Sequence, residues 1–130
     1  RADFVSLNEP ELRLAAHNRH DSLEDVSAQV ADKVQAQRLA ITRGTKGAMM
    51  VDINAGETFR VPALSSRVID RIGAGDAFLS LSSICLGKGI DTQVAAFVGS
   101  VAAAMDVQIV CNRDPIDQVS LKKYVSTLLK

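Results

Sequence analysis

The sequence predicts an α/β fold in which a mainly parallel sheet is covered by helices on both faces. The first observation behind this prediction is that short apolar segments with the length of strands are interleaved with segments of helical periodicity. Such interleaving is typical of parallel sheets, because a helix carries the chain back between neighbouring strands. The second is that 130 residues, 47% hydrophobic and 23% charged, have the size and composition of one globular domain. No repeat or linker is visible, so we expect one structural unit.

The first half of the chain is predicted to contain all of the strands and two helices. Asn8 is a good N-cap, Pro10 suits a first helical turn, and Glu11 stands where it can reach back to the cap. Ser22, three residues before Asp25, resembles a second capping box. Glycine-containing turns at 44–47 and 54–56 join the later strands. The expected elements are a strand over 3–7, helices over 9–20 and 22–37, and strands over 38–42, 48–53 and 58–61.

The second half is predicted to be helical, with helices over 76–88, 91–107 and 120–130. The longest apolar run, from Val94 to Met105, is too short to span a bilayer and is interrupted by Gly99 and Ser100, so it indicates a buried helix. An amphipathic seam defines the last helix, with apolar side chains at i, i+3, i+4 and i+7: Leu121, Tyr124, Val125 and Leu128.

Charge and cysteine content exclude several classes of protein. Lysine plus arginine and aspartate plus glutamate both number 15, so neither a nucleic-acid nor a membrane-surface partner is expected. Cys85 and Cys111 are far apart and belong to no C-x-x-C pair, which favours two thiols in a reducing cytoplasm. His17 and His20 are three apart on an expected helix, but their polar neighbours favour a solvated face over a metal pair. The chain opens without a signal peptide or an initiator methionine, which indicates part of a longer cytoplasmic protein.

The segment from Gly73 to Asp76 is the strongest indication of chemistry. Glycines allow backbone N–H groups to converge, and a helix start adds unpaired N–H donors and a positive dipole end, so phosphate is attracted there. A carboxylate beside phosphate is explained if Asp76 accepts the proton of a hydroxyl that attacks it. The alternative is that Asp76 only caps the next helix. Dinucleotide-binding and P-loop glycine patterns are excluded, because the first needs glycine at Phe78 and the second a Gly-Lys-Ser/Thr ending.

The nine residues Asp70-Arg71-Ile72-Gly73-Ala74-Gly75-Asp76-Ala77-Phe78 resemble the second signature of the ribokinase-like (PfkB) carbohydrate kinases, with Arg71 in place of the family's usual threonine. The resemblance implies that the backbone of Gly73, Ala74 and Gly75 forms an anion hole for the transferred phosphoryl group. It implies that Asp76 is the catalytic base. It also implies a monovalent cation such as K⁺ near Asp70 and the Ile72 carbonyl.

Two other segments resemble motifs of the same family, in the same order along the chain. Asn8-Glu9-Pro10-Glu11 resembles its Asn-x-x-Glu motif, which implies that Asn8 and Glu11 organise Mg²⁺ and the phosphates; helix capping alone explains the same residues and does not exclude this role. The segment from Thr42 to Gly47 is either a simple turn between strands or the family's nucleotide-phosphate segment. The second interpretation assigns phosphate contacts to Thr42, Gly44, Lys46 and Gly47.

The small residues of the 98–112 region indicate close helix packing, and the resemblance adds an adenine pocket there. It points to Ala102, Cys111 and Asn112, with Cys111 in place of the usual glycine.

Taken as a whole, residues 1–130 resemble the C-terminal, nucleotide-binding part of a ribokinase-like kinase domain, without the N-terminal half that holds substrate and lid. The implied reaction is ATP-dependent, Mg²⁺-assisted phosphorylation of a hydroxyl on a sugar or sugar phosphate, and we expect the segment alone to be inactive. The similarity is greatest to heptose-phosphate kinases, which implies a fused nucleotidyltransferase domain. The sequence leaves open whether the protein forms a homodimer. The alternatives are a nucleoside or vitamin-precursor kinase and a non-catalytic nucleotide-binding module.

Overall fold

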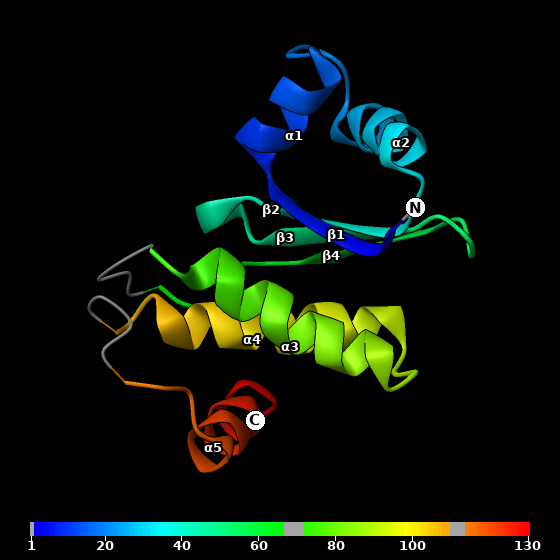
Figure 1. Ribbon diagram of the computed structural model, residues 1–130. Coiled ribbons are helices and arrows are strands. Elements are labelled where there is room, and N and C mark those ends of the chain that lie inside the picture. The colour runs from blue at the N-terminus through cyan, green and yellow to red at the C-terminus, as the bar shows by residue number, and fades with distance from the viewer. Residues whose placement is uncertain (1, 67–71, 110–113) are drawn as a thin grey trace. The chain divides into compact units, whose positions relative to one another are not determined.

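The structure is a computed structural model that describes residues 2–66, 72–109 and 114–130 (Figure 1). It divides into two compact units, Arg1–Pro62 and Ala63–Lys130. Among the described residues, the first contains the sheet, two α-helices and a 3-10 helix, and the second contains three α-helices. Each unit is described by itself.

The first unit holds a four-stranded sheet in the order β1-β2-β3-β4. Strand β1 pairs with β2 in parallel, whereas β2–β3 and β3–β4 are antiparallel pairs. The described sheet is therefore mixed rather than mainly parallel, because the turns after β2 and β3 are too short for anything but hairpins. Its elements are β1 (Ala2–Asn8), α1 (Glu9–Ala16), α2 (Leu23–Val34), β2 (Ala36–Thr42), the 3-10 helix η1 (Gly44–Lys46), β3 (Ala48–Asp52) and β4 (Glu57–Val61).

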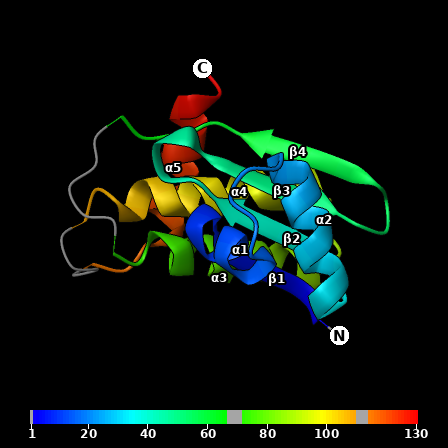
Figure 2. The same ribbon diagram turned by 90° about the horizontal axis from the view of Figure 1, so that it is seen from above.

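Helices α1 and α2 lie over one face of this sheet (Figures 1 and 2). Leu39 and Ile41 are two residues apart on β2, so both side chains point to the same face, and both are fully buried. The hydrophobic core on this face is made by Leu12, Leu23, Val26, Val30, Ala31, Leu39, Ile41 and Met49. Its burial holds both helices against β2 and thereby positions the residues at the ends of β1 and β2.

Two helices end earlier than the sequence predicted. Helix α1 stops at Ala16, because His17 takes the left-handed conformation at φ 53° and its N–H bonds to the Leu14 carbonyl. Neither His17 nor His20 therefore lies within the helix, although both side chains are exposed as expected. Helix α2 stops at Val34 because Gln35 is also left-handed, at φ 49°, and the next two residues begin β2.

The second unit contains α3 (Ala74–Gly87), α4 (Thr92–Asp106) and α5 (Gln118–Leu128). Helices α3 and α4 pack closely at Gly99, where a β-carbon would overlap Ser82 Oγ and lie 3.0 Å from the Phe78 carbonyl oxygen. Helix α5 begins two residues before the predicted start, because the Asp117 carboxylate accepts hydrogen bonds from the next amides. The Tyr124 hydroxyl of α5 donates to the Leu64 carbonyl at 2.8 Å. Among the described residues, no helix has both the length and the apolar character needed to cross a bilayer.

Candidate functional site

Asn8 and Glu11 form the capping box that the sequence predicted at the start of α1. The Glu11 amide donates to Asn8 Oδ1 at 2.8 Å, and the Asn8 amide donates to Glu11 Oε2 at 2.9 Å. Pro10 lies in the first turn, where its missing N–H costs nothing. The cap holds one amide and one carboxylate side chain together at the carboxyl end of β1.

Thr42 lies beside this cap, because it is the register partner of Asn8 in the parallel β1–β2 pair. The turn that follows requires glycine at two positions, with Gly44 at φ 57° and Gly47 at φ 83°. It is closed by the Arg43 amide donating to the Gly47 carbonyl at 2.8 Å and the Gly47 amide to the Gly44 carbonyl at 3.0 Å. The Lys46 side chain is exposed at the tip of this turn. Two of the predicted motifs therefore meet at the carboxyl ends of adjacent parallel strands, where α/β sheets bind ligands.

An ion-pair cluster that the sequence interpretation missed joins these two motifs. Arg43 Nε donates to Glu9 Oε2 at 2.9 Å, and Arg13 donates to Glu9 Oε1 from Nε at 3.1 Å and Nη2 at 3.0 Å. The hydrogen bond from Arg43, helped by Arg13, holds the pKa of Glu9 below its usual value, although partial burial opposes this. Since the folded-state pKa is the lower one, the stabilisation is present at neutral pH and is lost as pH falls through that lowered pKa. The sequence does carry a signal for this cluster: Glu9 directly follows β1, and Arg43, of opposite charge, directly follows β2.

The glycine-rich segment of the second unit forms the start of α3. Gly73 is the N-cap at φ 94°, which only glycine adopts readily, and the first helical bond runs from the Ala77 amide to the Gly73 carbonyl at 2.8 Å. The amides of Gly73, Ala74, Gly75 and Asp76 therefore have no acceptor within the helix and lie at its positive end. This arrangement suits the predicted anion hole.

Asp76 is not the N-cap of α3, so the interpretation that this residue only caps the helix is wrong. It lies in the first turn, two residues after the start that Gly73 makes possible, and the side chain caps nothing. Its carboxylate is exposed and makes no hydrogen bond or ion pair among the residues that the structure describes. A carboxylate beside amides that have no acceptor in the helix, and without a partner in the described part of the chain, is available for proton transfer.

The remaining predicted site residues are less informative. Ile72 is 72% exposed just before Gly73, whereas Ala102 is fully buried within α4. Asp70, Cys111 and Asn112 lie outside the described residues. Within the described part of the chain, no three side chains of histidine, cysteine, aspartate or glutamate gather as a metal site.

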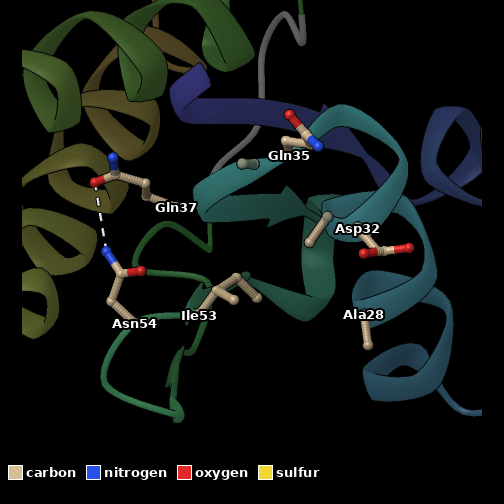
Figure 3. A pocket seen from close by; sticks show the side chains of 8 residues that line it. Ala28, Asp32, Gln35, Gln37, Ile53 and Asn54 are labelled. Carbon is tan, nitrogen blue, oxygen red and sulfur yellow. Dashed lines mark hydrogen bonds between the residues drawn. The ribbon is translucent and has the colours of Figure 1, made fainter. Parts of the chain in front are cut away.

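A groove of about 500 Å³ in the first unit lies away from these motifs (Figure 3). One side is bridged by Asn54 Nδ2, which donates to Gln37 Oε1 at 3.4 Å. The groove lies at the beginning of β2, whereas Thr42 lies at the end of the same strand. Roughly 20 Å of strand therefore separate the groove from Thr42. The groove is lined by Ala28, Ala31, Asp32, Gln35, Ala36, Gln37, Ile53 and Asn54. It is therefore distinct from the predicted phosphate site.

Comparison with known proteins bears directly on this arrangement. The family model of the pfkB family carbohydrate kinases matches residues 1–117. The chain belongs to this family. The pfkB family match includes all three segments that the sequence singled out, from Asn8, from Thr42 and from Asp70 onward.

Among curated relatives, the pfkB chain is 34% identical over 101 residues to the bifunctional protein HldE of Desulfatibacillum aliphaticivorans, covering 78% of this chain and 20% of that protein. The chain thus spans about a fifth of the length of this relative. Among solved structures it is similar to ribokinase from Thermotoga maritima, with a TM-score of 0.82 and 20% identity, over 95% of this chain and 42% of that one. Phosphofructokinase-2 from Escherichia coli in complex with potassium gives a TM-score of 0.83 at 17% identity, over 98% and 41%. The predicted ribokinase-like α/β fold, present here as part of a domain, is confirmed.

Proposed function

We propose that this chain is the nucleotide-binding part of a kinase that transfers the γ-phosphoryl group of ATP to a hydroxyl of a sugar or sugar phosphate. The observation that carries the proposal is the start of α3, where amides without an acceptor in the helix occur together with the Asp76 carboxylate, which has no partner among the described residues. Membership of the pfkB family supports the reaction class. The printed name of the HldE relatives, bifunctional protein, supports a second activity elsewhere in the protein, which we assign to a fused nucleotidyltransferase domain. The resemblance to heptose-phosphate kinases favours a sugar phosphate as acceptor. We place the reaction in the cytoplasm.

In this proposal Asp76 accepts the proton of the attacking hydroxyl, while the backbone amides of Gly73, Ala74 and Gly75 stabilise the charge that develops on the transferred group. Fixed amide donors are effective because they need no reorganisation during the reaction. Gly73 permits the turn that exposes them. The Thr42–Gly47 turn, with Lys46 at its tip, holds the other phosphates of the nucleotide.

Asn8 and Glu11 fit an indirect role in organising Mg²⁺. The ion prefers oxygen donors and usually keeps waters and phosphate oxygens as ligands, so one carboxylate and one amide suffice without a cluster of acidic side chains. When bound, Mg²⁺ neutralises phosphate charge. A K⁺ ion at Asp70 and the Ile72 carbonyl is the corresponding proposal for a monovalent cation, supported by the potassium complex of phosphofructokinase-2.

The reaction is tested by measuring ADP release by the complete protein with ATP, Mg²⁺ and a panel of sugars and sugar phosphates. We expect acceptor-dependent turnover, highest with a heptose phosphate. Turnover with nucleosides alone would overturn the sugar assignment. Nucleotide binding without turnover on any acceptor would identify a binding module instead.

Replacing Glu11 with glutamine separates capping from metal organisation. Glutamine can still reach back to the Asn8 amide, so we expect little change in Tm. Loss of the charge should raise the Mg²⁺ concentration for half-maximal rate by about 10–100-fold, as found for residues that orient metal ligands. The matched control is Glu24→Gln, which changes a first-turn glutamate of α2 that pairs with Arg60. An unaltered Mg²⁺ requirement in Glu11→Gln would leave this residue only its cap.

A further inference from the structure

The carboxylate of Glu9 has both oxygens engaged by arginines from two different parts of the first unit. Oε2 accepts from Arg43 in the turn after β2, and Oε1 accepts from Arg13 one helical turn along α1. Only about a fifth of each of these three side chains is exposed. Partial burial of a charged, geometrically matched contact strengthens it relative to an ion pair in open water.

This contact joins the two phosphate motifs, 8–11 and 42–47, at the place where the sheet brings them together. Asn8 and Thr42 are register partners, so the next residues along each strand, Glu9 and Arg43, leave the sheet side by side. The Arg43 backbone also closes the turn at both ends, because its amide donates to the Gly47 carbonyl and its carbonyl accepts from the Lys46 amide. Holding the Arg43 side chain therefore holds the turn.

We propose that Glu9 is a positioning residue that sets the Thr42–Gly47 turn against the start of α1, so that nucleotide phosphates and the Mg²⁺ organiser Glu11 are held in a fixed relation. This inference rests on the proposed function. Arg13 supplies the anchor on the helix side: its Nη1 also donates to the carbonyls of Arg19 and Asp21 in the loop before α2. Glu9 thus acts through Arg43 and needs no contact with substrate.

The direction in which one substitution changes ATP affinity distinguishes a positioning role from a simple effect of charge. In Glu9→Gln the side chain keeps its shape, but an amide has one acceptor oxygen and can serve only one of the two arginines. If only charge mattered, removal of a negative group near bound phosphates would tighten ATP binding. Positioning requires the opposite result, a weaker binding of roughly three- to tenfold, because a charge-assisted contact to the turn is lost.

The experiment uses the complete protein and two readouts. Hydrogen exchange of the 43–47 amides reports the turn without nucleotide, and we expect faster exchange in Glu9→Gln. The dissociation constant and KM for MgATP should rise three- to tenfold, with KM for the acceptor unchanged. Arg43→Gln should behave alike, and the double variant should be no worse than the worse single variant, because both act through one contact.

Arg38→Gln is the matched control, since it removes a guanidinium from a partly buried ion pair with Asp52 near the other end of β2. It should leave exchange at 43–47 and MgATP binding unchanged. Unchanged exchange in Glu9→Gln, or faster exchange with unchanged or tighter MgATP binding, would overturn the positioning role. Absence of acceptor-dependent turnover in the unmodified protein would instead overturn the proposed function, and the exchange measurement separates the two failures.

Discussion

Replacing Asp76 with asparagine is expected to lower the turnover number by roughly 10²–10⁴-fold, the contribution typical of a general base. Asparagine keeps the size of the side chain but cannot accept the proton of the attacking hydroxyl. The helix start should survive, because Gly73 rather than Asp76 is the cap. ATP binding should change little, since the amides that we propose to contact phosphate belong to the backbone. Single-turnover kinetics together with a direct measurement of ATP affinity check both parts.

Asp91→Asn is the matched control for this substitution. Asp91 is also an exposed aspartate at a helix start, but its carboxylate caps α4 by accepting from the Gln93 and Val94 amides. Asparagine caps almost as well, so we expect neither activity nor Tm to change appreciably. If Asp76→Asn retained full turnover, the assignment of the base would be wrong. Equal losses of ATP affinity and turnover would mean that Asp76 supports the phosphate site structurally.

Replacing Gly99 with alanine is expected to destabilise the protein by about 1–3 kcal/mol, the usual cost of overpacking a well-packed core. The added methyl group would overlap Ser82 Oγ and would lie 3.0 Å from the Phe78 carbonyl oxygen and 3.1 Å from its ring. Neither neighbour can move cheaply, because Ser82 is fully buried and donates to the Ala95 carbonyl at 3.2 Å, and the Phe78 oxygen belongs to the backbone. Helices α3 and α4 would have to separate. Urea unfolding of the complete protein measures the loss.

Gly87→Ala is the control for the glycine substitution, because nothing lies within 4 Å of its added β-carbon on α3. There alanine should be neutral or stabilise by up to about 1 kcal/mol, since it reduces the freedom of the unfolded chain. In addition, Ser82→Ala should partly rescue Gly99→Ala, because it removes the overlapping oxygen. A Gly99→Ala protein as stable as the unmodified one would show that α3 and α4 do not pack as closely as described.

The parts of the structure that the sequence predicted well are those in which a few adjacent residues decide the outcome. The cap at Asn8 and Glu11 needs only local contacts, and both of its hydrogen bonds are present. The turn at Gly44 and Gly47 follows from glycine's access to positive φ. The sequence predicts the start of α3 two residues late, because the N-cap is Gly73 and no capping side chain marks the start.

The parts that failed depend on residues distant in the sequence or on less common backbone conformations. His17 and Gln35 end their helices with positive φ, which non-glycine residues seldom adopt, so no propensity indicated it. The contact between Glu9 and Arg43 spans 34 residues of sequence and exists only because β1 and β2 pair in one register. The roles of the predicted site residues, including Asp76, stay predictions that the experiments above test.

The register of β1 and β2 determines where this chain can change its length. Since alternate residues of a strand face opposite sides, adding or deleting one residue within either strand would place Asn8 opposite a neighbour of Thr42 and turn one motif to the other face of the sheet. The turn over residues 53–56, between β3 and β4, carries no such constraint, because it is exposed and Gly56 has open space around it. Insertions and deletions among natural variants should therefore accumulate in that turn and be absent from β1 and β2. The same turn is the place in this unit to insert a peptide tag without disturbing the phosphate motifs.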